Sequence, residues 1–168
     1  MGRAKAVQAE EAARRAGQGD AALLAKIRAV PGCEALTWDD VQLASTIFAV
    51  KPGDGSAREQ AASCQRVLGA GANIVNEYAT KRYRSNLINW GMLPLLADAA
   101  LAQKLSVGDC FVLPGIRTAV EQDAASVTGW LVSAAGAVEA VELRLGDLTA
   151  DERQIILDGC LINFYNHN

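Results

Sequence analysis

The chain has 168 residues, of which 51% are hydrophobic and 21% charged, and its formal net charge is −3 at pH 7. A chain of this length buries roughly two thirds of the surface that its unfolded form exposes, so it can fold as one domain without a disulfide or a metal to hold it together. The composition excludes disorder as the main state, and no apolar run reaches the roughly 18 residues that a membrane-spanning helix needs.

The first 36 residues are predicted to form a helical N-terminal arm. Residues 3–16 are mostly Ala, Glu, Gln, Arg and Lys, which favours a helix with little apolar surface. A second helix is expected over 20–29, with Leu23, Leu24 and Ile27 on one face, and it ends before the Pro-Gly pair at 31–32. We expect residues 1–36 to be the arm and residues 37–168 to be the main domain, which opens with a capped turn at Thr37 to Asp40.

The centre of the chain alternates predicted strands and helices. The expected order is a strand at 47–50, a helix at 56–68, a strand at 73–75 and a helix at 80–89 that Gly91 stops. This strand-helix-strand rhythm predicts a pair of parallel strands, and therefore an α/β fold.

The last third is predicted to be antiparallel. Three strands are expected at 109–113, 127–132 and 138–145, separated by Gly, Pro and acidic turns. Thr149 and Glu152 form the pattern of a capping box, which predicts an amphipathic helix that runs on through Phe164.

The most informative stretch is GDGSAREQAAS, residues 53–63, between a predicted strand and a predicted helix. Gly53 and Gly55 let the backbone turn sharply and approach a ligand, while the first amides of the helix point outward as anion receptors. Ser56 would lie at the lip of that turn with its hydroxyl exposed, and Arg58 could bind a carboxylate through two hydrogen bonds. A carboxylate or phosphate site is therefore indicated, although the Lys-Ser or Lys-Thr pair of a nucleotide-binding P-loop is missing.

A purely structural interpretation of the same residues stays open. Ser56 and Glu59 fit a capping box, in which the serine caps the helix, the glutamate reaches back and Arg58 is a solvated surface charge.

A second stretch, residues 76–95, has basic residues on both sides of a tyrosine: Lys81, Arg82, Tyr83 and Arg84. Such a pattern can bind nucleic acid through phosphate contacts and stacking. The chain is acidic overall, however, and shows no second basic face. A solvated helix face is favoured, and a nucleic-acid partner is not expected.

The potential metal ligands are scattered. Cys33, Cys64, Cys110 and Cys160 form no CxxC pair, and His167 is the single histidine. We therefore expect no metal site built by this chain alone. Reduced, buried cysteines are the expected state, which favours a reducing compartment and a cytoplasmic location.

Together the two stretches resemble the C-terminal swivel domain of the aconitase superfamily, which includes aconitate hydratases and the small subunit of 3-isopropylmalate dehydratase. The family's G-x-G-S-S-R-E-H-A loop stands here as GDGSAREQA at 53–61. Its S-F-A-R stretch, which leads to N-x-x-x-x-G-L-L-P, stands as EYAT at 77–80 followed by Asn86 and GMLP at 91–94. The resemblance covers residues 47–95 well and the later VGDCFVLPG more loosely.

The resemblance implies a swivelling three-layer β/β/α domain with the helical arm added at its N-terminus. The family's chemistry is reversible dehydration of a hydroxy-polycarboxylate, in which iron of a [4Fe-4S] cluster binds the hydroxyl and a serine removes a proton from the neighbouring carbon. By position Ser56 matches that catalytic base and Arg58 matches the arginine that holds a substrate carboxylate, with Gly55 and Ala57 as further substrate-binding positions. A serine is too weak a base unless loop amides and cations stabilise its alkoxide.

The chain departs from the family pattern at several positions. Ala57 replaces a second serine, Gln60 replaces the histidine, and the segment from Tyr78 to Asn86 is one residue longer. The T-D strand motif that usually opens the swivel domain has no counterpart before Ile47. These changes imply a different substrate specificity or a weaker activity.

The resemblance also implies a partner, because the cluster-binding cysteines of the family belong to its other domains. The leading hypothesis is a swivel domain or small subunit of an aconitase-like hydro-lyase, completed by a cluster-bearing large subunit or N-terminal domains against which the arm would pack. The alternative is a non-catalytic module of the same fold that binds a partner protein or RNA through residues 81–84.

Overall fold

A computed structural model describes residues 2–167 of the chain. Six strands form a single sheet in the order β1-β2-β3-β6-β5-β4. The strands are β1 (Ser45–Ala49), β2 (Ala70–Val75), β3 (Leu93–Leu96), β4 (Cys110–Val112), β5 (Ser126–Val132) and β6 (Val138–Arg144).

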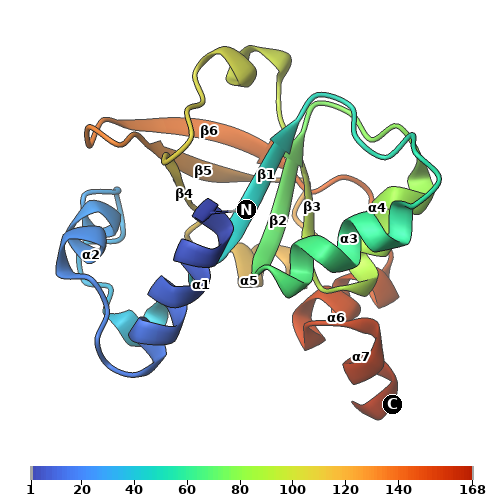
Figure 1. Cartoon of the computed structure of the whole chain (residues 1–168), viewed down its shortest axis with the longest axis horizontal. Helices are drawn as coiled ribbons and strands as arrows, with labels where there is room; N and C mark the ends of the chain where they lie inside the picture. The colour runs from blue at the N-terminus through green and yellow to red at the C-terminus, as the bar shows by residue number, and fades with distance from the viewer. Residues whose placement is uncertain (1, 168) are drawn as a thin grey trace.

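Helices precede, connect and follow these strands (Figure 1). The α-helices are α1 (Gly2–Arg15), α2 (Ala21–Arg28), α3 (Arg58–Val67), α4 (Lys81–Asn89), α5 (Ile116–Glu121), α6 (Ala150–Asp158) and α7 (Leu161–His167). Two short 3-10 helices, η1 (Trp38–Asp40) and η2 (Ala99–Gln103), complete the described elements. Within residues 2–167, no helix combines the length and the apolar character that crossing a bilayer requires.

The sheet has two halves of different character. Strands β1, β2 and β3 are parallel, whereas β4, β5 and β6 are antiparallel, as the sequence predicts for the two parts of the chain. The halves join through one aligned pair, Leu96 on β3 and Arg144 on β6, and their strands run in crossing directions (Figure 1). The mixed α/β fold is thus confirmed. The sheet is strongly twisted, and its parallel and antiparallel halves supply the two β layers.

Strand β3 was not predicted. Its sequence is only LPLL, and a proline cannot donate a hydrogen bond within a sheet. The strand forms because Leu95 and its neighbours are buried beside β2, in register with Ala72 to Val75.

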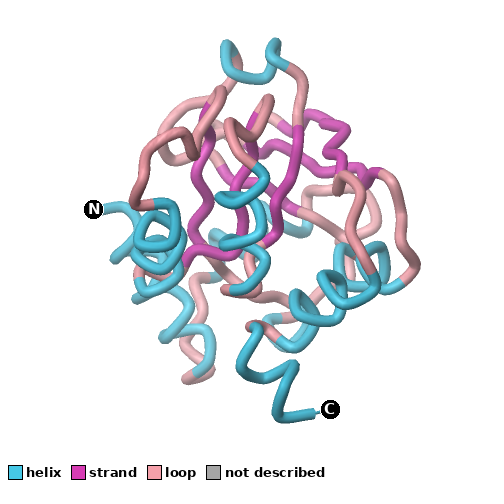
Figure 2. The backbone as a smooth tube through the Cα atoms, turned by 90° about the vertical axis from the view of Figure 1, so that its right-hand side faces the viewer, coloured by secondary structure: helices cyan, strands magenta, loops and turns pink. Residues whose placement is uncertain are grey.

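Helices cover the parallel half of the sheet and close the core. α3 packs on α4, and α4 and α5 both pack on α6. Figure 2 shows helices arranged around the strands. The central core draws its side chains from both halves of the sheet and from the helices; it includes Ile74, Ile88, Leu95, Val120, Leu131, Leu143 and Ile155.

The C-terminal prediction of one continuous helix was wrong. The capping box at Thr149 and Glu152 forms as expected, but the helix ends at Asp158 and α7 begins at Leu161. Gly159 lies between them at φ +88°, a left-handed conformation that stops a helix. Its carbonyl group passes so close to Gly91 that a Cβ atom on Gly91 would overlap it.

The N-terminal arm has the two predicted helices, but it packs on this chain's own sheet. Ile27, Val30 and Cys33 are buried in a cluster with Val132 at the end of β5. The expectation that the arm packs on a missing partner is therefore corrected for α2. Its apolar side chains already have a site on the antiparallel half of the sheet.

Helix α1 is attached by polar contacts centred on Glu11. The Glu11 carboxylate accepts hydrogen bonds from Arg14 Nε at 2.7 Å, Arg15 Nε at 2.8 Å and the amide of Leu43 at 2.9 Å. Arg14 also donates from Nη1 to the carbonyl of Trp38 at 2.7 Å. The Arg14 guanidinium in particular lowers the pKa of Glu11 to about 2, so this carboxylate stays charged and holds the arm to the main domain.

Candidate functional site

Two loops meet where parallel strands β1 and β2 end. The first leads from β1 into α3 and carries Ser56, and the second leads from β2 into α4. Backbone hydrogen bonds join them: Glu77 donates to Val50 at 3.0 Å, and Ala79 donates to Pro52 at 2.9 Å. Ligands of open α/β sheets bind in this position, at the carboxyl ends of neighbouring strands. The structure therefore brings together the two stretches that the sequence singles out.

Gly53 fixes the path of the first loop over the second. Its φ is +98°, and a Cβ atom there would lie 2.5 Å from the Cβ of Tyr83, so only glycine fits. The Gly53 carbonyl oxygen accepts hydrogen bonds from Thr80 Oγ1 at 2.9 Å and from Arg58 Nε at 3.0 Å. Thr80 also caps α4 by accepting from the amide of Tyr83 at 3.3 Å. One oxygen thus connects the turn to the starts of both helices.

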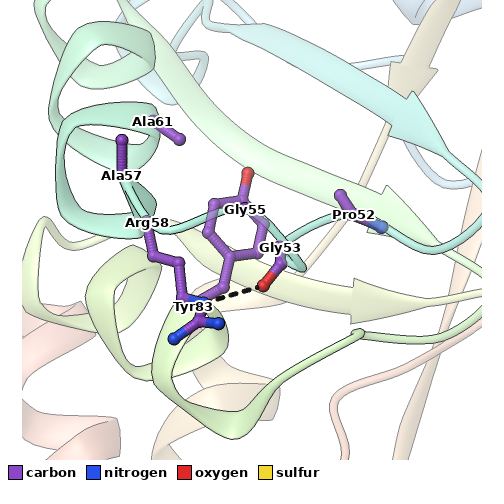
Figure 3. Close-up of a pocket in the computed structure, with 7 residues that line it drawn as sticks. All are labelled: Pro52, Gly53, Gly55, Ala57, Arg58, Ala61 and Tyr83. Carbon is purple, nitrogen blue, oxygen red and sulfur yellow. Dashed lines mark hydrogen bonds between the residues drawn. The ribbon is translucent and has the colours of Figure 1, made fainter.

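Arg58 lies in the first turn of α3, half-buried beneath the loop (Figure 3). Its Nε donates to Gly53, and its Nη2 lies 3.4 Å from the carbonyl oxygen of Asp54. A guanidinium has five N–H groups, so these two bonds use one side and leave the end-on pair of amino groups able to donate further. That pair matches the two oxygens of a carboxylate.

Ser56 lies at the top of the turn, exposed to solvent. The N-cap of α3 is Ala57, which provides no side-chain cap, and Glu59 instead accepts a hydrogen bond from Trp90 Nε1 at 2.9 Å. The capping box suggested by Ser56 and Glu59 is therefore wrong. No side chain among residues 2–167 caps the first amides of α3, and the Ser56 hydroxyl has no hydrogen-bond partner there.

A hollow of about 300 Å³ lies beside this turn (Figure 3). Gly55, Ala57 and Arg58 line it, while Ser56 lies between two of these residues and is not itself part of the lining. A Cβ atom on Gly55 would meet nothing within 4 Å, so packing does not require glycine at this position. The remaining lining residues are Pro52, Gly53, Ala61 and Tyr83.

Tyr83 forms the buried floor of the hollow. Its hydroxyl is 2.8 Å from Nε2 of Gln65 and 2.9 Å from Nδ2 of Asn73, both of which donate to it. The ring of Tyr78 lies 6.2 Å from that of Tyr83, centroid to centroid, and burial raises the pKa of the Tyr78 hydroxyl well above its ordinary value. The Tyr78 phenol therefore stays neutral, and the Tyr83 side chain packs against Gly53 of the loop.

The basic stretch does not form the interleaved surface that nucleic-acid binding needs. Tyr83 is only 3% exposed, so it cannot stack on a base. Arg84 donates to the carbonyl of Asp147 at 2.9 Å and lies 3.8 Å from the Glu152 carboxylate. Lys81 and Arg82 remain exposed. The helical repeat of α4 turns Tyr83 to its buried side and leaves Lys81 and Arg82 on its exposed side.

The potential metal ligands of the described residues lie apart from one another. Within residues 2–167, no three His, Cys, Asp or Glu side chains converge on a common point. Cys33 is buried, Cys64 is exposed, Cys110 and Cys160 are half-buried, and all four are free thiols. The side chains of this chain therefore do not fit a [4Fe-4S] cluster, which needs several thiolates together.

The sequence analysis did not identify Thr80 and Tyr83 as residues that hold the loop in place. Thr80 was visible as a helix N-cap signal, but its bond to Gly53 spans 27 residues. Tyr83 was interpreted as a surface aromatic because basic residues flank it. In the structure Tyr83 is buried and lies against Gly53.

The part of the chain that matches a known family includes the two loops of this site. Residues 32–100 match the family model for the aconitase C-terminal domain, so α1 and α2 lie outside the matched part. Among solved structures, the chain is similar to 3-isopropylmalate dehydratase (leuD) from Methanocaldococcus jannaschii, with 24% sequence identity and a TM-score of 0.53. The alignment covers 77% of this chain and 68% of that one. No curated protein matches the chain.

Proposed function

We propose that this chain is the small subunit or swivel domain of an aconitase-superfamily hydro-lyase that dehydrates and rehydrates a hydroxy-polycarboxylic acid. The match of residues 32–100 to the aconitase C-terminal domain and the fold similarity to 3-isopropylmalate dehydratase (leuD) support the proposal. The observation that carries the proposal is that one turn holds both an unbonded serine hydroxyl, of Ser56, and a guanidinium group, of Arg58. Ser56 is exposed without a structural partner, and Arg58 lines the neighbouring hollow while it donates from Nε to Gly53.

In this proposal Arg58 positions the substrate. Its end-on amino groups bind one carboxylate, while its bonds to Gly53 and Asp54 keep the guanidinium from moving away. Gly55 and Ala57 line the hollow beside it and contact the bound acid. Preorganised donors of this kind contribute to catalysis because they need no rearrangement when the substrate arrives.

Ser56 takes the role of the base that removes a proton from carbon next to the substrate carboxylate. An ordinary hydroxyl is a poor base near neutral pH, so its negative form needs stabilising. The uncapped first amides of α3 and the Arg58 guanidinium supply positive charge beside the turn. Closing the site against a partner would exclude water and strengthen these interactions.

We also propose that a [4Fe-4S] cluster belongs to the partner, since the side chains of this chain do not fit one. The partner would be a cluster-bearing large subunit or further domains of a longer protein. No step assigned to this chain passes through the cluster. The chain binds a carboxylate, orients the acid and accepts a proton. The four free thiols support the proposed cytoplasmic location.

The test is reconstitution with a cluster-bearing large subunit of the same superfamily. We expect dehydration of a hydroxy-polycarboxylate that neither component catalyses alone, followed as formation of the conjugated alkene in the ultraviolet. Citrate, isopropylmalate and related hydroxy acids are the substrates to try. A stable complex that dehydrates none of them would refute the proposed function.

A further inference from the structure

We propose that the buried polar atoms beneath the hollow bind one internal water molecule, which joins α3, β2 and α4 under the turn that carries Ser56. These atoms belong to four side chains that we call the tyrosine cluster: Gln65, Asn73, Tyr78 and Tyr83. The inference does not depend on the proposed function, because it concerns hydrogen bonds within this chain alone.

The tyrosine cluster contains polar atoms that are buried without a partner. Among residues 2–167, four buried side-chain polar atoms lack a hydrogen bond, and three of them lie in this cluster: Gln65 Oε1, Asn73 Oδ1 and the Tyr78 hydroxyl. Asn73 is 0% exposed, so its amide oxygen cannot reach bulk solvent. A buried polar group without a hydrogen bond costs free energy, and folded proteins commonly satisfy such groups with ordered water.

The unpartnered atoms lie around the Tyr83 hydroxyl. Asn73 Nδ2 donates to it at 2.9 Å and Gln65 Nε2 at 2.8 Å, so the oxygen of each side-chain amide is close to the same hydroxyl. The Tyr78 ring lies 6.2 Å from the Tyr83 ring, centroid to centroid. Burial, and after it the neighbouring Tyr83, raises the pKa of Tyr78, so the Tyr78 hydroxyl keeps its proton and can donate it.

The unused hydrogen-bonding capacity of the cluster matches a water molecule. The amide oxygens of Gln65 and Asn73 need donors. The Tyr78 hydroxyl has a proton to donate, and so has the Tyr83 hydroxyl, whose oxygen already accepts two bonds. Water has two protons and two lone pairs, so one molecule can donate to both amide oxygens and accept from both phenols. Buried waters in proteins typically make about three such bonds.

Direct contacts alone do not satisfy the cluster. If the amide of Gln65 or Asn73 were turned round, its oxygen would accept the proton of Tyr83, but its NH₂ group would lose its bond to the Tyr83 oxygen. One buried amide group would then lack a partner in place of another. A bridging water satisfies both ends of both amides.

The water site lies under the turn because Tyr83 does. The Tyr83 side chain packs against Gly53 and lines the hollow. Gln65 belongs to α3, Asn73 to β2 and Tyr83 to α4, so one water connects the three elements that meet below the turn.

A high-resolution crystal structure of the full chain tests the site directly. We expect electron density for one water within about 2.7–3.2 Å of both Gln65 Oε1 and Asn73 Oδ1. Well-ordered side chains with no water between these two atoms would overturn the inference.

Tyr78→Phe tests the same site in solution through the sign of its effect. If the hydroxyl donates to a bound water, its removal loses one hydrogen bond, and the equilibrium constant for unfolding should rise about fivefold. A hydroxyl buried without a partner is unfavourable, so its removal would leave stability unchanged or increase it, and that result would overturn the inference. Urea denaturation measures the difference. Tyr165→Phe is the matched control, because Tyr165 is 70% exposed, and it should leave the unfolding equilibrium unchanged.

Discussion

Arg58 donates a hydrogen bond from Nε to the carbonyl oxygen of Gly53, 3.0 Å away, across the turn that carries Ser56. The same side chain therefore shapes the loop and lines the hollow. Lysine carries one compact ammonium group and cannot make both sets of bonds at once.

Arg58→Lys should consequently reduce kcat/KM of the reconstituted complex by about a hundredfold, the size expected for loss of a two-point charged hydrogen bond. Steady-state kinetics with the full complex measure this. Arg66→Lys is the matched control, because Arg66 also lies on α3 and donates to a backbone carbonyl, that of Ala70 at 3.1 Å, but lies outside the hollow. Equal losses in the two variants would contradict a role in substrate binding.

The two glycines of the turn should behave differently when replaced. Gly53→Ala forces a Cβ atom against Tyr83 at a φ of +98° and should destabilise the fold by about 2–4 kcal/mol. Gly55→Ala meets no neighbour, so the free energy of unfolding should change by less than about 1 kcal/mol while substrate binding weakens. Urea denaturation of both variants measures the difference. A Gly55 variant that is the less stable of the two would contradict this assignment.

The S/T-x-x-E patterns that begin at Ser56 and at Thr149 should separate in stability measurements. Thr149 accepts from the amide of Glu152, and the Glu152 side chain accepts from the amide of Thr149 at 2.9 Å, which is a complete capping box. Thr149→Ala should therefore cost about 1 kcal/mol, whereas Ser56→Ala should cost almost nothing. Thermal or chemical denaturation of both variants checks this. A substantial loss in Ser56→Ala would mean that the hydroxyl has a structural role.

The Glu11 contacts predict an acid-sensitive attachment of the arm. In the folded chain the pKa of Glu11 is lowered from 4.5 to about 2, mainly by Arg14, so the stabilisation is present above about pH 4.5 and is lost as the pH falls towards 2. The loss should be of the order of 2 kcal/mol. This is less than the full pKa shift would give, because Glu11 is close to solvent and part of the shift is screened. Glu11→Gln should be less stable at pH 6 and should lose less between pH 5 and 2. Unfolding curves at several pH values test this, and parallel pH profiles for the two proteins would contradict it.

Much of the architecture could be predicted from periodicity and turn residues. The parallel and antiparallel parts, the two arm helices and the Thr149 cap all follow local signals, and local signals suffice where a segment buries one regular face. Strand β3 could not be predicted in this way, because LPLL is short and contains a proline. Its formation depends on burial beside β2, which local sequence does not show.

The site was predictable to a similar extent. The glycine-rich turn, Ser56 and Arg58 are visible in one short stretch; in the structure Arg58 lines the hollow and Ser56 lies exposed on the turn beside it. The Ser56 and Thr149 patterns look alike in sequence, yet only Thr149 caps its helix, because Glu59 bonds to Trp90 instead. That partner lies 31 residues away, and contacts of such separation depend on the folded arrangement.

The most direct test of the account is the activity of Ser56→Ala in complex with a cluster-bearing large subunit. We predict that the variant folds with unchanged stability and assembles normally, and that kcat falls by a factor of about 10²–10⁴, the usual contribution of a general base. Dehydration at the wild-type rate by a fully assembled Ser56→Ala complex would contradict the central claim.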